Sequence, residues 1–368
     1  MICVRSTTFL ATISNAEVLK TITEHSAESN RLKDRSRRIV RILSQIIVMV
    51  AIIGALLWYV GLGSLFNTLS EIKLEYLPLA FIAYFGINLL FAVRLRRVLG
   101  KEGIKTSFGR TLLAQYAGML TSDVTPGRSG YFLTHVYLRD QGVPTAVSLS
   151  GILGIQTIEF LTKVFGGVLA LIFLVETANL TSGLLVVASL GIGLMLVGAI
   201  LLAAMSWSQR VISLFNRVVS SRFLARFTVG LMGKLEEYKE SARKTRKAIP
   251  EIALVTIMCW ILKGFEWYFL GLALGITQIG WLGFFLLHPM VTALGFVPLT
   301  PSGIGFQEGA IVGVFVLLGL STPQALAFAL LSRVLLIVED LIGVPQIAKS
   351  TSSLIFSRKI SADKPIIR

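Results

Sequence analysis

The sequence is poor in charged residues and in the side chains that usually build metal or nucleophile sites. Asp, Glu, Lys and Arg make up 15% of its 368 residues, whereas soluble domains carry about 25%. Two cysteines and three histidines are present, and none is spaced as a ligand pair. We therefore expect no disulfide framework, no metal site and no cofactor. A phosphate-binding loop of the form G-x-x-x-x-G-K-[ST] is also missing, which excludes that route to nucleotide hydrolysis.

Long apolar runs dominate the sequence instead. Hydrophobic residues make up 54% of the chain, and a membrane-spanning helix needs about 20 of them in succession. Six stretches meet that length and are predicted to cross a bilayer: 39–60, 77–93, 146–175, 182–205, 252–276 and 323–347. Two more apolar stretches, 111–138 and 281–320, are broken by TPGRSG at 125–130 and TPSGIG at 300–305. The expected fold class is all-α, a polytopic membrane bundle with six full spans.

The basic residues lie mainly outside the apolar runs and indicate an orientation. The chain has 35 Lys and Arg against 20 Asp and Glu, a net charge of +15. Most of the basic residues precede the first predicted span, follow the last, or lie in 94–110 and 206–249. Cytoplasmic loops carry such an excess, so both termini are predicted to be cytoplasmic. The charge then reflects membrane topology rather than nucleic-acid binding.

This topology divides the chain into three parts. Residues 1–35 are predicted to be a cytoplasmic segment, 36–350 the transmembrane domain, and 351–368 a cytoplasmic tail. Within the domain, the loop 206–249 mixes apolar and basic side chains. We expect an amphipathic helix there, lying on the inner membrane surface.

The two breaks resemble each other. Both read T-P-x-x-x-G, and each lies between a predicted span and a long helix that follows a Gly-containing turn. With six full spans and both termini on one side, each broken stretch must leave the membrane on the side it entered. We therefore predict two re-entrant hairpins in an inverted-topology repeat, about 77–175 and 251–347, as in many secondary transporters. The alternative is two coincidental proline kinks in ordinary helices.

Ionisable residues inside the apolar segments are candidates for a transport site, because a charge at the bilayer centre costs at least about 2.5–3.5 kcal/mol. They are Arg128, Glu159, Lys163, Lys263, Glu266, Glu308, Arg333, Glu339 and Asp340. Thr125 and Gln307, in and beside the breaks, join the predicted substrate-binding set. Arg128 is predicted to face a ligand, because a guanidinium in a Gly-rich break suits bidentate phosphate binding.

The other charged residues also have structural interpretations. Glu159 and Lys163 are four residues apart, and Lys263 and Glu266 three, so each pair shares a helix face and could simply hold helices together. Arg333 could meet the acidic pair at 339 and 340 only across neighbouring helices. That acidic pair could instead lie near the inner interface, and the carboxylate at 308 could cap a helix.

Two segments resemble the signatures of a known family. Residues 120–153 read LTSDVTPGRSGYFLTHVYLRDQGVPTAVSLSGIL, and residues 295–333 contain a P-x-G-x-G-x-x-E core before a Gly-rich apolar helix. Together they resemble the lysylphosphatidylglycerol synthase transmembrane region, also called the flippase-like or UPF0104 family, over about 36–350. In place of the family's usual acidic–Arg pattern after the first break, this chain has Glu159 and Lys163.

The resemblance implies a membrane domain that moves lipids between leaflets. By the family motif it also puts these positions in the predicted substrate-binding set: Pro126, Arg128, Gly130, Pro301, Gly303, Gly305 and Glu308. Larger relatives couple it to a cytoplasmic aminoacyltransferase; this chain ends about 20 residues after its last predicted span, so we expect no such domain and no enzymatic activity. The expected function is a lipid translocase of the cell membrane, acting on an anionic phospholipid or a polyprenyl-phosphate lipid, with a homo-oligomer possible. A membrane glycosyltransferase or accessory protein for lipid-linked sugars, and a carrier of a small soluble anion, are the alternatives.

Overall fold

A computed structural model describes residues 40, 43–178, 182–208, 210, 211, 213, 225–293 and 300–352. They belong to two units, Met1–Ala51 and Ile52–Arg368. In the first unit the described residues are helical. The predicted segment 1–35 and nearly all of the tail 351–368 lie outside the described residues. The architecture below is that of the second unit.

The described part of the second unit is all-α. Its longer helices are α3 (Leu77–Lys101), α4 (Phe108–Asp123), α6 (Thr145–Thr177), α7 (Ser182–Trp207), α9 (Ala225–Arg246), α10 (Ile249–Ala273), α11 (Trp281–Ala293), α12 (Phe306–Leu317) and α13 (Thr322–Asp340). Shorter elements are α2 (Leu62–Ser70), α5 (Thr134–Arg139) and the 3-10 turns η1 (Leu74–Tyr76), η2 (Ser129–Leu133) and η4 (Leu341–Gly343). Proline occupies the first turn of α3, α10 and α13, where its missing N–H costs no helical hydrogen bond.

Five helices among the described residues are long and apolar enough to cross a membrane. They are Leu43–Val60, Leu74–Lys101, Thr145–Thr177, Ala188–Trp207 and Ile249–Ala273. Five of the six predicted spans therefore have a matching helix, and the chain is a polytopic membrane protein.

The sixth predicted span, 323–347, is not among these five helices. Helix α13 ends at Asp340, the turn η4 follows, and a new helical segment begins at 344. Three ionisable residues, Arg333, Glu339 and Asp340, lie in α13 and are buried. These three charged side chains need protein partners inside a membrane domain, and they lower the mean hydropathy of the helix.

The broken stretches consist of short helices. The first contains α4, η2 and α5, and the second contains α11 and α12, with residues 294–299 outside the described part. At 1.5 Å per residue, the 12-residue helix α12 is about 18 Å long, whereas the hydrocarbon core of a bilayer is about 30 Å thick. Neither α11 nor α12 alone could span it.

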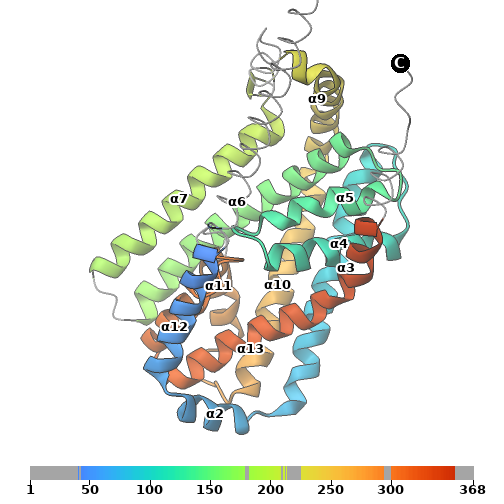
Figure 1. Ribbon diagram of the computed structural model, residues 1–368. Coiled ribbons are helices and arrows are strands. Elements are labelled where there is room, and N and C mark those ends of the chain that lie inside the picture. The colour runs from blue at the N-terminus through green and yellow to red at the C-terminus, as the bar shows by residue number, and fades with distance from the viewer. Residues whose placement is uncertain are drawn as a thin grey trace, which may run out of the picture. The chain divides into compact units, whose positions relative to one another are not determined.

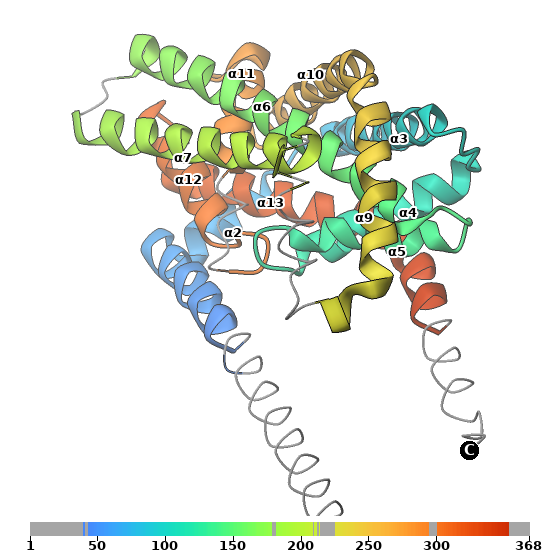
Figure 2. The ribbon, with the colours of Figure 1, turned by 90° about the horizontal axis from the view of Figure 1, so that it is seen from above.

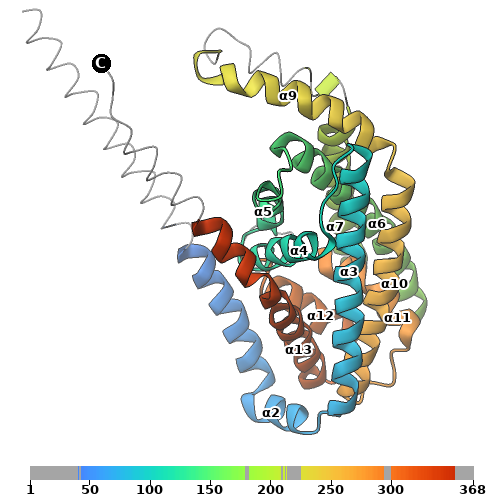
Figure 3. The same cartoon turned by 90° about the vertical axis from the view of Figure 1, so that its right-hand side faces the viewer.

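Helix pairs from distant parts of the sequence form the frame around the two breaks. Helix α3 packs along α10, and the two run side by side in Figure 3. Helix α6 packs against both α7 and α11, and Figure 2 shows α6 and α7 lying next to each other. Helix α4 contacts α13 and the η4 turn. Figure 1 gives the positions of these helices along the chain.

An aromatic cluster lies within the buried core. Trp267 packs edge-on against Phe315 and Phe328, with ring centroids 6.3 and 5.3 Å apart, and Phe284 stacks on Phe328 at 5.5 Å. A Cβ at Gly271 would lie 2.6 Å from the Phe284 ring. The cluster thus joins α10, α11, α12 and α13, which fixes the second break relative to α10.

Helix α9 accounts for the second half of the predicted amphipathic loop 206–249. Its described side chains pack against the bundle: Tyr238 OH donates to Met205 O at 3.0 Å, and Ser241 Oγ donates to Glu102 Oε1 at 2.8 Å. Residues 214–224, where the predicted surface helix would begin, lie outside the described part.

Candidate functional site

The two Thr-Pro breaks adopt the same backbone conformation. The two residues that follow each proline have left-handed φ angles, 60° and 55° at Gly127 and Arg128, and 48° and 66° at Ser302 and Gly303. The N–H of the fourth residue bonds to the Thr carbonyl in both: Arg128 N to Thr125 O at 3.2 Å, and Gly303 N to Thr300 O at 3.3 Å. Arginine and serine rarely adopt this conformation, and such residues cluster at functional sites.

The breaks also contact each other. Pro126 and Pro301 form an isolated antiparallel bridge, in which Ser302 N donates to Thr125 O at 2.9 Å. Segments 175 positions apart in the sequence are therefore adjacent, and each supplies a partner for the other's backbone. The bond between the breaks gives a partner to backbone N–H and C=O groups that have no partner in a regular helix.

The first break packs tightly against the last turn of α4. A Cβ at Gly130 would lie 2.1 Å from Thr121 O, so only glycine fits. Thr125 Oγ1 accepts from Gly130 N at 2.6 Å and donates to Thr121 O at 2.8 Å. The predicted residues Thr125 and Gly130 thus hold the break in place rather than line a cavity.

An arginine from α13 anchors the second break. Arg333 Nε donates to Glu308 Oε1 at 2.7 Å, and its other nitrogens contact Ser302 Oγ at 3.4 Å and Gln307 Oε1 at 3.3 Å. The second carboxylate oxygen of Glu308 accepts from Gly305 N at 2.6 Å, which caps α12. Arg333 therefore pairs with Glu308 and not with Glu339 or Asp340, the partners considered from the sequence.

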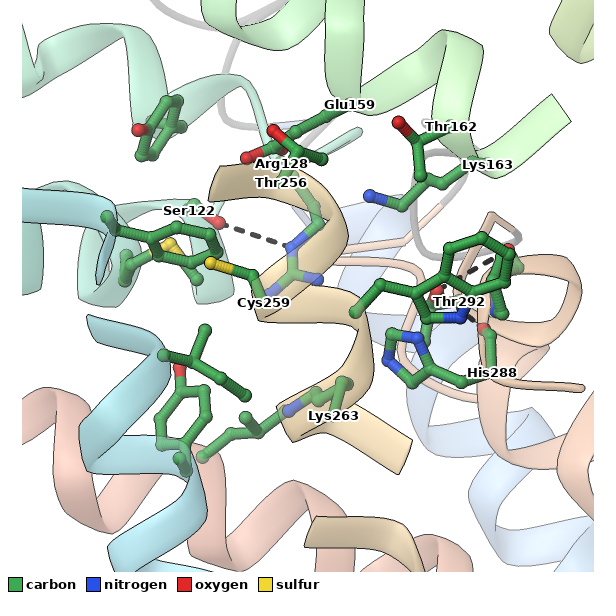
Figure 4. A pocket seen from close by; sticks show the side chains of 18 of the residues that line it. Ser122, Arg128, Glu159, Thr162, Lys163, Thr256, Cys259, Lys263, His288 and Thr292 are labelled. Atoms are coloured by element: carbon green, nitrogen blue, oxygen red, sulfur yellow. Dashed lines mark hydrogen bonds between the residues drawn. The ribbon is translucent and has the colours of Figure 1, made fainter. Parts of the chain in front are cut away.

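An open cavity of about 150 Å³ lies beside the first break. Its walls come from α3, α4, α6, α10, α11, α12 and α13. The charged and polar residues that line it are Ser122, Arg128, Gln156, Glu159, Thr162, Lys163, Thr256, Lys263, His288, Thr292, Gln307 and Ser332. Figure 4 shows Arg128, Lys163 and Lys263 extending toward the same space from the break, α6 and α10.

Three of the four charged side chains that line the cavity form an ion pair with a buried residue outside the cavity wall. Arg128 Nη2 donates to Asp123 Oδ1 at 2.9 Å, and its Nε to Ser122 Oγ at 3.2 Å. Lys263 pairs with Glu266 one turn along α10, as the sequence spacing predicted. Glu159 forms an ion pair with Arg94 of α3, a partner that the sequence did not indicate. These pairs lower the cost of holding charges at membrane depth.

A proline inside α11 explains one polar contact in the cavity wall. Pro289 has no N–H, so the carbonyl of Phe285 lacks its helical donor. Trp260 Nε1 donates to that carbonyl at 2.7 Å. A Cβ at Gly166 would lie 2.6 Å from Pro289 Cγ, so α6 and α11 approach closely here.

A second polar cluster joins α3, α4 and α13. Tyr84 OH donates to both carboxylate oxygens of Asp340, at 3.1 and 3.0 Å. Tyr116 OH donates to Glu339 Oε1 at 2.8 Å, and Asn88 Nδ2 contacts the same atom at 3.4 Å. Tyr84 lines the cavity, whereas Glu339 and Asp340 lie behind it.

The structure thus separates the predicted residues into groups. Arg128, Glu159, Lys163, Lys263 and Gln307 line the cavity. The supporting residues are Thr125, Pro126, Gly130, Glu266, Pro301, Gly303, Gly305, Glu308, Arg333, Glu339 and Asp340. Arg94, Asp123, Tyr84 and His288 were missed, since their role depends on which helices meet. In the described part of the chain, no cluster of three or more His, Cys, Asp or Glu side chains could hold a metal ion.

Comparison with known proteins gives the family. Residues 46–339 match the family described as lysylphosphatidylglycerol synthase TM region. The chain belongs to this family. It is also similar to two proteins described as UPF0104 membrane proteins. One, from Methanothermobacter thermautotrophicus, is 20% identical over 84% of this chain and 92% of its own length. The other, from Pyrococcus horikoshii, is 22% identical over 85% and 98%. The match spans both breaks, so the paired turns and the cavity lie within the family's domain.

Proposed function

We propose that this chain is a lipid translocase that moves a phosphate-containing headgroup between leaflets through the cavity, while the lipid tails stay in the membrane. The observation that carries the proposal is the convergence of Arg128, Lys163 and Lys263 on one cavity beside the paired breaks. Cationic side chains within a membrane domain usually mark a substrate path. The family's description also names a domain associated with a phospholipid.

The proposal includes an inverted-topology repeat with re-entrant hairpins. In such a repeat α3 corresponds to α10, α4 to α11, and α6 to α13. The packing of α4 on α13 then corresponds to the packing of α11 on α6, and both contacts are observed. The same correspondence relates the α3–α6 contact to the α10–α13 contact. The matching turns at the two breaks support the same relation. Binding at a repeat interface near the bilayer midplane is common in such transporters.

In this proposal Arg128 binds the phosphate, and Lys163 and Lys263 complement its charge. The guanidinium is 15% exposed and already offers one edge to Asp123, so the phosphate would compete with that carboxylate or bind the remaining nitrogen. The substrate is an anionic phospholipid or a polyprenyl-phosphate lipid. No catalytic step and no cofactor are needed. We also propose that the protein lies in the cell membrane with both termini cytoplasmic, which the distribution of basic residues in the loops favours.

The test is a reconstitution of the full chain into liposomes with a fluorescent phosphatidylglycerol. Transbilayer movement is followed by extraction of the outer-leaflet probe with albumin. We expect faster movement than in empty vesicles, and a loss of at least about tenfold in Arg128→Gln, because one charge-assisted phosphate contact contributes about 1.5–3 kcal/mol. Arg97→Gln is the matched control, since Arg97 is exposed on α3 and lies outside the cavity.

Movement no faster than in empty vesicles, for both phosphatidylglycerol and a polyprenyl phosphate, would refute the proposal. A parallel set of vesicles loaded with labelled glycerol 3-phosphate separates it from the alternative function. Efflux of that soluble anion, without movement of the lipid, would identify a carrier of small anions instead.

A further inference from the structure

The cavity wall formed by α11, α12 and α13 carries polar side chains that the proposed phosphate position does not use. They are His288, Thr292, Gln307 and Ser332, and the last three are 6%, 4% and 4% exposed. We call these four residues the polar subsite. Figure 4 shows His288 and Thr292 on the α11 side of the cavity, away from Ser122. The subsite therefore faces a different part of a bound headgroup.

Gln307 gives the polar subsite a hydrogen-bond donor. Its Oε1 accepts from Arg333 Nη2 at 3.3 Å. Because a guanidinium can only donate, this contact fixes the amide with its oxygen toward Arg333. The Nε2 group that remains forms no hydrogen bond with the described residues. An unpaired donor on a buried side chain is costly, so this group is placed to donate to a ligand in the cavity.

Thr292 and Ser332 give the subsite acceptors. Thr292 Oγ1 donates to His288 O at 2.8 Å, and Ser332 Oγ donates to Ala329 O at 2.9 Å. A hydroxyl has one proton and two lone pairs. Each of these hydroxyl groups has therefore used its proton within its own helix, and its oxygen can still accept a hydrogen bond from the cavity.

His288 adds a nitrogen that can serve in either role. Its Nε2 is buried and has no hydrogen-bond partner among the described residues. Trp267 packs edge-on against the imidazole, with ring centroids 4.8 Å apart, which holds the ring in position. A nitrogen of a neutral imidazole either donates or accepts, depending on the tautomer. Together the four side chains thus present both donors and acceptors.

The charges that line the same cavity restrict what the subsite can bind. Arg128, Lys163 and Lys263 are cationic. Glu159 is the one carboxylate among the described lining residues, and it already pairs with Arg94. An ammonium group in the headgroup would therefore be repelled by three cations. A hydroxyl group is neutral and both donates and accepts, so it matches the subsite.

We propose that the polar subsite binds the hydroxyl groups of a polyol headgroup, so that the preferred substrate is a phosphodiester lipid carrying glycerol or a sugar. This inference deepens the proposed function and rests on it. Gln307 lies directly after the second break, whose Ser302 N donates to Thr125 O of the first break at 2.9 Å. The start of α12 is thereby held next to the break that carries Arg128, and one headgroup can contact both.

The experiment compares fluorescent lipids with identical tails in liposomes that contain the full chain, after subtraction of the rate in empty vesicles. Phosphatidylglycerol and phosphatidylethanol carry the same single phosphodiester charge, but only the first has hydroxyl groups on its headgroup. At a low probe fraction phosphatidylglycerol should move about two- to tenfold faster, because one neutral hydrogen bond changes binding by about that factor. Phosphatidylethanolamine, which carries an ammonium group, should move no faster than phosphatidylethanol.

Substitutions in the subsite should change the ratio of the phosphatidylglycerol rate to the phosphatidylethanol rate. His288→Phe keeps an aromatic ring and removes Nε2, and Gln307→Met removes the amide donor; both should bring the ratio toward one. Arg128→Gln should lower both rates and leave the ratio as it is. His135→Phe is the matched control, since His135 lies on α5 and does not line the cavity; it should keep the wild-type ratio.

Three results would overturn the inference and leave the translocase proposal standing. The first is a wild-type ratio near one. The second is a ratio that stays unchanged in both His288→Phe and Gln307→Met, or that falls equally in His135→Phe. The third is faster movement of phosphatidylethanolamine than of phosphatidylethanol, which would identify a site for an ammonium group instead. No movement of any of the three lipids would overturn both proposals.

Discussion

The anchor of the second break should contribute strongly to stability, and a double-mutant cycle on Arg333 and Glu308 measures it. Both side chains are nearly inaccessible, 9% and 2% exposed, and their contact is 2.7 Å. Arg333→Met leaves the carboxylate buried without its cation, which costs about 3–5 kcal/mol. Glu308→Gln keeps an oxygen for Gly305 N but leaves the guanidinium without its counter-charge, so a similar loss is expected.

The double variant removes both charges and retains the helix cap. What it loses is mainly the hydrogen bonds from the guanidinium, at about 0.5–1.5 kcal/mol each. Its loss should therefore be smaller than the sum of the two single losses, by at least about 1.5 kcal/mol. Equilibrium unfolding of the four proteins by dodecyl sulfate in mixed micelles measures this coupling. Additive losses would show that the pair does not stabilise the break, and would refute the argument from burial.

Four further substitutions test the packing of the breaks and the surface. Gly130→Ala should destabilise by about 1–3 kcal/mol or more, since its Cβ would lie 2.1 Å from Thr121 O; Gly309→Ala, which meets open space in α12, should instead be neutral or stabilising by up to about 1 kcal/mol. Thr125→Val removes the acceptor of Gly130 N and should cost about 1–3 kcal/mol, with faster hydrogen exchange at that amide. Lys101→Ala breaks an ion pair whose side chains are 40% and 39% exposed, so unfolding should change by less than about 1 kcal/mol.

The sequence was sufficient to predict features that depend on local composition. Apolar runs near 20 residues long predicted five helices with suitable length and hydropathy. Pro and Gly predicted both breaks, because each removes helical hydrogen bonds or permits left-handed backbone. The Lys263–Glu266 pair was predicted for the same reason, since its geometry is set by the helix repeat alone.

Features that depend on which helices meet were missed or misassigned. Glu159 pairs with Arg94, 65 positions away in the sequence, and Arg333 with Glu308 across the turn between α12 and α13. Arg94 lies near the cytoplasmic end of a predicted span, so its charge was attributed to membrane topology. Its guanidinium is in fact buried against Glu159, Thr256 and the Phe91 ring. The hydrophobic periodicity of the sequence does not distinguish a buried Arg94 from a loop arginine. The difference depends on whether other helices pack over that end of α3.

The two breaks are alike in backbone but unlike in charge. The second left-handed position is Arg128 in the first turn and Gly303 in the second, so only the first turn directs a cation to the cavity. The second turn receives its cation from behind, where Arg333 is satisfied by Glu308, Gln307 and Ser302. Under the proposed function the first turn binds the headgroup anion, and the second turn contacts the first through the bond from Ser302 N to Thr125 O. An arginine at the position of Gly303 would place a second guanidinium group beside the Pro126–Pro301 bridge, and the repulsion between the two like charges would be costly inside a membrane domain.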